Sequence, residues 1–581
     1  MNNSRTIETA ASPDLVTFTI LVDGNELSAV YQVKNIVVEK QLNRIPFAQI
    51  VFIDGDAATQ EFALSSEDTV IPGAEVEIKA GYHSDEETIF KGIVIKHSIK
   101  VRESAAVLVI ECRDAAVKAT LGRKSKYYYE STDSDIIDEI LGQYSLETDV
   151  TATDHSHTEL VQYDCSDWDF ALLRAQANGL LCGVDDGKVS FFEPDLSQDE
   201  VETVSFGATL LSFDGEIDAR NQFDSITAFS WNPADQEIVE VEAADPGLSL
   251  NGNLSPGDLA GVVGLESLQL RHGGNVSDTE LQAWSDSKAL HQQLSKTRGR
   301  LQFTGIPGVK PGSLLKVEGV GDRFNGKVFV SAVRHELSEG NWTVDAEFGI
   351  NPDWFSECFE VNAPAAAGLL PAVHGLQIGV VTQLEGDPDG EDKILIQLPI
   401  VDKEEQGIWA RLATLDAGEN RGTFFRPEIE DEVIVGFING DPNEAVVLGQ
   451  LHSSAKPAPE AGSDDNHLKG YVSRSEMKLT FDDDKIAFTI ETPAGKKVTL
   501  DEDAGTIVIE DDHSNVVTLD DSGITMESAG DINIKASGDV NIEGTNVGIT
   551  ANAEFKAEGS AGAEVSTSAI AVLKGSLVQI N

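Results

Sequence analysis

A run of short alternating segments near the C-terminus restricts the fold more than any other feature of this sequence. Ile532 and Ile534, Val540 and Ile542, and then 547–549 place apolar side chains at every second position, with starts about eight residues apart. A period of two is typical of a β-strand with one buried face. A strand of about five residues cannot bury that face or pair its two edges alone, so the pattern predicts a stacked β repeat.

The repeat extends in both directions from these segments. Weaker copies follow at 553–557, 563–567, 570–572 and 578–580. Earlier copies are longer and more acidic, and they lie at 478–481, 487–491, 497–500, 506–510, 516–519 and 524–527. We therefore expect a needle of β repeats that begins near Lys478.

Three arrangements could satisfy such a repeat. Three chains could wind into a triangular prism, with each chain giving one strand to every layer. A single chain could instead form a solitary β-helix, or the strands could form an ordinary meander sheet. Tight turns and small inner residues (Ile, Val and Ala) favour the three-chain prism, whereas a flat meander of such short strands would expose long edges.

Length and charge limit the number of domains and the kinds of partner that are expected for the whole chain. With 581 residues, three or four domains are expected. The formal net charge of −57 would repel nucleic-acid phosphates and anionic lipid head groups, so neither is an expected partner. Residues 1–14 have no cationic start and no apolar run, so synthesis in the cytoplasm without a signal peptide is expected.

The four cysteines also fit a cytoplasmic origin. Cys112, Cys165, Cys182 and Cys358 are scattered, without the spacing of a zinc site, and they read as small buried side chains in a reducing compartment.

The sequence divides into seven stretches of mainly β character. We expect a first barrel at 1–125, a helical and mixed segment at 126–200, a second barrel at 201–362, a linker at 363–374, an OB-type barrel at 375–452, a second linker at 453–470 and the needle at 471–581. Helices are expected after the capping residues at 132–135, at 166–178 and at 278–294. The OB-type barrel is predicted from five apolar runs, at 379–383, 393–398, 407–413, 432–438 and 445–448.

Several motifs in this order resemble VgrG-type spike proteins of contractile injection systems, which are similar to the hub and central spike of contractile phage tails. The stretch 162–170 reads QYDCSDWDF and continues to Arg174 and 178–180, with Cys165 where the family usually has Glu. The stretch 89–94 reads IFKGIV, like a hub strand of the family. Further likeness lies in the OB-type region, at 408–411 (IWAR), 417–418 (AG), 422–427 (GTFFRP), 431–437 (DEVIVGF), 439–442 (NGDP) and 447–449 (VLG).

This resemblance implies a fold, a role and partners. The two barrels would be tube-like hub barrels, and three copies would present a pseudo-sixfold base to a hexameric inner tube protein. The OB unit would form a collar above an intertwined trimeric β-helix. A PAAR-like tip protein would dock on Gln579, Ile580 and Asn581, and baseplate components would be further partners. The implied role is a cell-puncturing spike that is driven through the target envelope by sheath contraction. It would be assembled into an injection particle and then be extracellular or delivered into the target envelope.

Signs of catalysis and of bound metal are weak. The stretch 321–327 has phosphate-loop spacing, but Val328 stands where Ser or Thr would hold Mg²⁺, so we expect a hairpin turn. His155 and His157 could bind a metal but are more typical of a polar loop. The acidic stretches 482–484 and 501–503 could attract Ca²⁺ and are more typical of solvated turns.

We expect no cofactor, no metal and no enzyme activity. The linker 453–471 is too short for the lysozyme domain that some phage relatives carry there, and the chain stops directly after the last alternating segment. The alternative from another functional class is a carbohydrate-binding or carbohydrate-cleaving β-helix tail protein. Such a protein would need aromatic platforms along the repeat, yet past Phe488 the only aromatic residue is Phe555.

Overall fold

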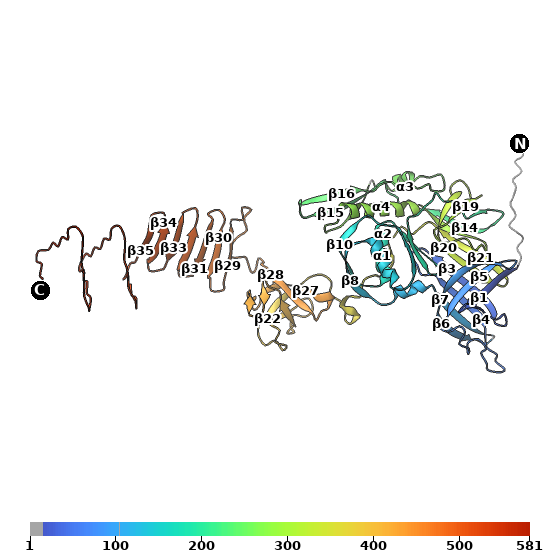
Figure 1. Ribbon diagram of the computed structural model, residues 1–581, viewed down its shortest axis with the longest axis horizontal. Helices are drawn as coiled ribbons and strands as arrows, with labels where there is room; N and C mark the ends of the chain where they lie inside the picture. Colours follow the sequence, from blue (N-terminus) through green and yellow to red (C-terminus); the bar gives the residue numbers. More distant parts are fainter. Residues whose placement is uncertain (1–14, 104, 266, 581) are drawn as a thin grey trace. The chain divides into compact units, whose positions relative to one another are not determined.

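The computed structural model describes residues 15–103, 105–265 and 267–580. The chain divides into two compact units, Met1–Ala372 and Val373–Asn581, and each is described by itself (Figure 1). Strands dominate both units, as the sequence predicts. Within the described ranges, no helix combines the length and apolar character needed to cross a bilayer.

A 13-stranded sheet is the frame of the first unit. Its N-terminal strands are β1 (Val16–Val22), β2 (Asn25–Glu26), β3 (Gln32–Gln41), β4 (Phe47–Ile53), β5 (Glu75–Tyr82), β6 (Asp85–Val101) and β7 (Ala106–Arg113). Its later strands are β13 (Glu202–Ser205), β14 (Leu210–Ile217), β18 (Thr297–Thr304), β19 (Leu314–Glu318), β20 (Gly326–Ser338) and β21 (Asn341–Phe348). β3 and β20 pair antiparallel, so the strands expected in two hub barrels join edge to edge in one sheet.

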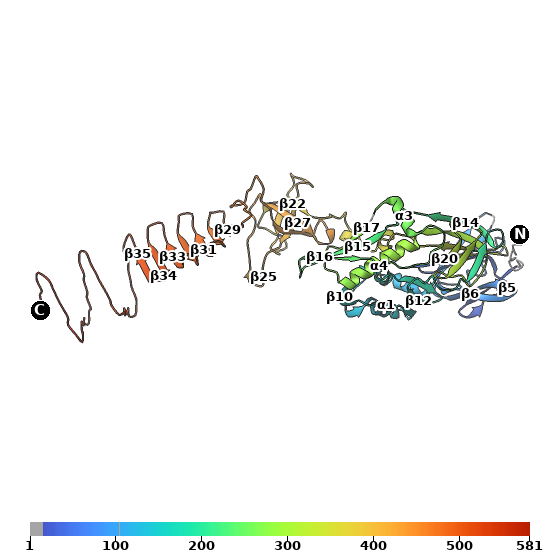
Figure 2. The same cartoon turned by 90° about the horizontal axis from the view of Figure 1, so that it is seen from above.

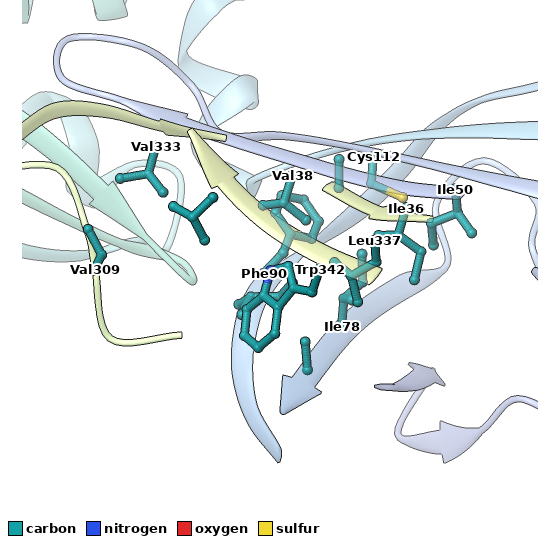
Figure 3. Close-up of a cluster of buried hydrophobic side chains, with 14 of the residues drawn as sticks. Ile36, Val38, Ile50, Ile78, Phe90, Cys112, Val309, Val333, Leu337 and Trp342 are labelled. Carbon is teal, nitrogen blue, oxygen red and sulfur yellow. The ribbon is translucent and has the colours of Figure 1, made fainter. Parts of the chain in front are cut away.

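One hydrophobic core runs across this junction (Figure 3). Alternate residues of β3, β4 and β5 point into it, and later strands add Val333, Leu337 and Trp342; all ten side chains labelled in the figure are at most 3% exposed. Cys112 belongs to this core, and Cys165 and Cys182 are buried elsewhere, as expected. Cys358 is exposed, so the prediction of a buried side chain is wrong for this cysteine.

A helical layer follows in the chain. It comprises η1 (Ala115–Thr120), β8 (Lys124–Thr132), α1 (Asp133–Gly142), β9 (Glu147–Val150), β10 (Ser156–Cys165), α2 (Asp167–Ala177), β11 (Leu181–Asp185) and β12 (Lys188–Phe192). Thr132 caps α1 in a capping box with Asp135, and Ser166 caps α2. Gly179, at φ 73°, follows the end of α2. Both expected helices are confirmed.

A small three-stranded sheet carries the longest helix of the first unit. Its strands are β15 (Ser225–Asn232), β16 (Glu237–Glu242) and β17 (Ser267–Arg271), and α4 (Asp278–Leu294) has the bounds that the sequence predicts. α3 (Pro256–Val263) was not expected, although Ser255 and Asp258 form a capping box around Pro256. The unit ends with α5 (Phe355–Cys358) and η2 (Ala365–Gly368).

The second unit begins with a closed five-stranded barrel, as predicted for the OB-type region. Its strands are β22 (Gln377–Gln383), β23 (Ile394–Gln397), β24 (Ile408–Leu412), β27 (Glu432–Phe437) and β28 (Ala445–Gln450). Inward-pointing Val381, Ile396, Val433 and Val447 are fully buried. A short hairpin, β25 (Ala417–Gly418) and β26 (Arg421–Gly422), lies between β24 and β27, and η3 (Ile438–Gly440) follows β27.

The acidic part of the needle forms a seven-stranded antiparallel meander within one chain. Its strands are β29 (Leu468–Val472), β30 (Lys478–Asp482), β31 (Ala487–Glu491), β32 (Lys497–Asp501), β33 (Thr506–Glu510), β34 (Val516–Asp520) and β35 (Gly523–Glu527). This arrangement corrects the expectation of one strand per layer from each chain. The turns are short enough for each strand to pair with the next, so the sheet is completed locally.

The later repeats behave differently. Among the described residues after Glu527, none belongs to a strand, although the sequence predicts strands there. The segment is drawn out in a zigzag in both views (Figures 1 and 2). An extended segment becomes a strand only when a neighbour lies about 4.8 Å away, and one chain alone provides none.

Candidate functional site: the apolar face of the needle sheet

One face of the needle sheet (β29–β35) is apolar along its length. Residues paired directly across an antiparallel sheet lie on the same face, so the strand register defines rows that cross all the strands. Two adjacent rows are apolar, one from β30 onward and the other from β29 onward. The first is Phe481, Phe488, Leu500, Ile507, Leu519 and Ile524; the second is Tyr471, Leu479, Ile490, Val498, Ile509, Val517 and Met526.

The side chains of these rows are largely exposed in the single chain. Phe481 is 52% exposed, Leu500 44%, Ile509 48% and Ile524 68%. Complete burial of one such side chain contributes about 1.5–3 kcal/mol. A continuous apolar surface of this kind indicates an interface with another molecule.

The opposite face of the same sheet is polar. Its central row consists of Thr480, Thr489, Thr499, Val508, Thr518 and Thr525. Beside that row, Lys and Glu alternate over β30–β33, and the Nζ atom of Lys497 lies 3.6 Å from a carboxylate oxygen of Glu510. Val516 and Glu527 continue this row in β34 and β35. The sheet is therefore amphipathic, with one face suited to water and one to a partner.

The segment after the needle sheet has unpaired backbone as well as exposed apolar side chains. Its apolar residues are at least half exposed: Ile532, Ile534, Val540, Ile542, Val547, Ile549, Phe555, Val565, Ile570, Val572, Val578 and Ile580. Within the described residues 529–580, no backbone–backbone hydrogen bond is formed. Backbone N–H and C=O groups need partners, and strands of other chains would supply them together with apolar cover.

The expected tip-docking residues lie at the end of this segment. Gln579 and Ile580 are exposed, Ile580 at 86%, and neither is in a strand. Asn581 lies outside the described residues. Docking of a tip protein on these residues stays a prediction.

The other sequence candidates fall into turns and one ion network. Residues 319–325 form the turn of the antiparallel β19–β20 hairpin, which confirms the hairpin reading of 321–327. The acidic stretches 482–484 and 501–503 lie at the β30–β31 and β32–β33 turns. There Asp482 accepts a hydrogen bond from the backbone N–H of Asp484 (3.2 Å), and Asp501 accepts one from that of Ala504 (2.8 Å).

His155 and His157 lie beside an acidic residue, Glu280, that the sequence did not indicate. Candidate ligand atoms of both histidines and of Glu280 lie within 4.8 Å of one another. The guanidinium of Arg174 lies in the same place, where its Nη2 is 2.9 Å from Glu280 Oε1 and 3.3 Å from His157 Nε2. A guanidinium cation there would repel a metal ion.

The same arginine forms a buried ion pair within this network. Arg174 donates to both carboxylate oxygens of Asp133 at 2.6 and 3.0 Å, and Asp133 is 1% exposed. Burial opposes ionisation of Asp133, but the hydrogen bonds and charge of Arg174 outweigh it and hold the pKa of Asp133 below its ordinary value. The network therefore ties α1, α2, β10 and α4 together.

Two domain families match this chain. The Alg8 N-terminal domain matches residues 12–339, which is more than half of the 581 residues. The injector OB domain of type VI secretion systems and phage baseplates matches residues 377–452, the range that holds the closed barrel.

Individual relatives match over shorter lengths. The type VI secretion system spike protein VgrG1b of Pseudomonas aeruginosa is 28% identical over 223 residues, which is 36% of this chain and 29% of that protein. The spike protein VgrG3 of Vibrio cholerae serotype O1 is 29% identical over 127 residues, 19% of this chain and 12% of that protein. The chain thus matches less than a third of the length of either relative.

A solved structure is also similar. It is an E. coli component of the type VI secretion system with structural similarity to bacteriophage T4 tail proteins, and it has a TM-score of 0.38 and 14% identity. The match covers 74% of this chain and 99% of that one.

The family matches include the motifs that carried the resemblance. The stretch 162–170 lies within the Alg8 N-terminal domain, and the OB motifs from 408 to 449 lie within the injector OB domain. The chain therefore belongs to the Alg8 N-terminal domain family, and it is a relative of the VgrG-type spike proteins.

Proposed function

We propose that this chain is the structural spike and baseplate hub of a contractile injection system and that it acts as a homotrimer. The amphipathic needle sheet carries this proposal. Its apolar face is largely exposed in the described chain, where Phe425 contacts it at Tyr471, whereas its polar face is already suited to water. A mechanical spike needs such a rigid, closed rod, because it must transmit compression without bending.

The geometry favours three copies. Each needle sheet would form one wall of a prism whose interior is filled by the two apolar rows. Below it, each extended segment of 529–580 has two unpaired edges, and in a three-chain helix the other two chains provide a neighbour on both sides. Such a closed arrangement leaves no exposed strand edges along the rod.

Electrostatics oppose the assembly. The trimer would carry 3 × −57 = −171 charges, and their repulsion must be outweighed by burial of the apolar face. With the Thr row and the Lys–Glu row facing outward, the charges of the needle sheet stay in water, where salt screens them.

The parts of the chain then have distinct roles in the proposal. The stretches 1–125, 126–200 and 201–362 form the hub that meets a hexameric inner tube protein and baseplate components. The linker 363–374 leads to the OB collar at 375–452, and the linker 453–470 leads to the needle at 471–581. Gln579, Ile580 and Asn581 receive a PAAR-like tip protein.

The proposed role is mechanical rather than enzymatic. The protein is made in the cytoplasm, assembled into an injection particle and crosses a membrane only while piercing it. The curated relatives described above are themselves named as spike proteins.

The mass of the purified chain in solution tests the proposal. Light scattering after size exclusion should give 3 × 62.3 = 186.9 kDa. The trimer should also persist in SDS without heating, because a closed β rod opens slowly. A mass of 62.3 kDa across the accessible concentration range would overturn the spike proposal.

A further inference from the structure

An ordered hairpin of the OB barrel holds large apolar side chains out in solvent. The loop between β24 and β27 contains β25 and β26, and Leu415 just before them is 95% exposed. Phe424 and Phe425 just after them are 83% and 58% exposed. These three residues form what we call the hairpin cluster.

Internal contacts fix the conformation of this hairpin. Arg421 forms an ion pair with Asp416 at 2.7 Å, and the backbone N–H of Thr423 donates to the carbonyl oxygen of Asp416 at 2.8 Å. Gly422 has φ +128°, and a Cβ atom there would lie 2.3 Å from that same carbonyl oxygen. Only glycine fits this position, so the chain closes into a defined hairpin instead of a flexible loop.

The hairpin cluster is continuous with the apolar face of the needle sheet. The rings of Phe425 and Tyr471 lie 4.8 Å apart at 55°. Tyr471 pairs with Leu479 and is the first member of the second apolar row. Whatever covers the needle face where the sheet begins therefore also reaches the hairpin cluster.

Charge does not select that partner. The loop between β24 and β27, residues 413–431, holds two arginines and five acidic residues, a net charge of 2 − 5 = −3, and the other apolar loop of the barrel, 399–407, has one lysine and three acidic residues, a net charge of 1 − 3 = −2. Arg421 and Arg426 are already paired within the chain, with Asp416 and Asp392. The contact between Phe425 and Tyr471 indicates the partner instead, because it places the hairpin beside the face that other copies cover in the proposed trimer.

We propose that the hairpin cluster packs against a second copy of this chain and closes the apolar interior where the needle sheet begins. Leu415 and Phe424 enter the neighbouring copy, and Phe425 joins the hairpin to the needle face through Tyr471. The inference rests on the proposed trimer, and it adds a specific clasp outside the needle. Tube, tip or cargo proteins are the other possible occupants of this surface.

Photo-crosslinking of the full chain tests the identity of the occupant. Leu415→benzoylphenylalanine should give, on irradiation of the purified protein, a covalent pair of 2 × 62.3 = 124.6 kDa on a denaturing gel. The matched control is Val401→benzoylphenylalanine, at a 77% exposed apolar residue of the loop 399–407, which should give no pair. Irradiation in producing cells should give the same product.

The outcomes separate this inference from the proposed function. A protein that is trimeric by light scattering but forms no Leu415 pair overturns the clasp and leaves the trimer intact. An adduct with a different protein in cells, in place of the pair, also overturns it. A monomer in solution overturns both proposals.

A second measurement does not depend on the photo-reactive side chain. The double variant Leu415→Ser with Phe424→Ser should lower the temperature at which the SDS-resistant trimer dissociates, because the clasp loses its apolar contacts. Val401→Ser should leave that temperature unchanged. Equal dissociation temperatures for the two variants would contradict the clasp.

Discussion

Leu500→Asp should dissociate the trimer, because it places a carboxylate on the face that the account assigns to the interior of the prism. Leu500 is 44% exposed in one chain, so closing the prism buries that remainder. At about 1.5–3 kcal/mol for full burial, each copy gains about 0.7–1.3 kcal/mol at this position, or about 2–4 kcal/mol for three copies. The aspartate forfeits this gain and adds three buried ions, each costing several kcal/mol, for a total of roughly 10 kcal/mol or more.

The neighbouring residue provides a matched control. Thr499 lies in the same strand but on the polar face, so Thr499→Asp introduces the same strand-disfavouring residue and leaves the carboxylate in water. Light scattering at neutral pH should show monomers for Leu500→Asp and trimers for Thr499→Asp. If both variants are trimers with the same resistance to heat, the apolar face is not the interface.

Three further predictions concern the first unit. Asp133→Asn breaks the buried pair with Arg174, so urea unfolding should show a free energy of unfolding lower by about 3–5 kcal/mol. The control Asp149→Asn, at the exposed pair with Lys188, should change it by less than about 1 kcal/mol. The pKa of Asp133 is lowered on folding, so its contribution is complete at neutral pH and is lost as the pH falls below 3.8; acid titration should show no such loss in Asp133→Asn. Phe90→Ala, at a fully buried ring, should cost about 3–5 kcal/mol in the same urea assay; a loss below about 1 kcal/mol would contradict the core packing.

Local signals in the sequence were sufficient for much of the fold. The caps at Thr132 and Ser166 and the apolar spacing after them define α1 and α2, because helix formation depends on residues a few positions apart. The five strands of the OB barrel follow from alternation and turns in the same way. The capping box around Pro256 is a local signal of the same kind for α3.

Contacts between distant residues could not be read from the sequence. The pairing of Ile36 with Leu337 unites strands about 300 positions apart, and no local pattern specifies it. No local pattern predicts that Glu280 lies beside His155 and His157 either.

The needle shows most clearly what a sequence pattern cannot predict. Alternation indicated apolar faces, but only the strand register shows that Leu500 and Ile507 lie side by side in one row. Exposed strand edges argue against a flat meander, yet β29–β35 form one within a single chain. Those edges are covered when three sheets close a prism. The sequence pattern alone does not distinguish a prism of three sheets from one built of one strand per layer from each chain.

Hydrogen–deuterium exchange of residues 532–578 in the full-length protein tests the central claim most directly. These amides have no backbone partner within the described chain, so any protection must come from other copies. The account predicts exchange at least about a thousandfold slower than in an unstructured peptide, comparable to the amides of β31–β33. Exchange at the unstructured rate in this segment, while β31–β33 stay protected, would contradict the three-chain needle.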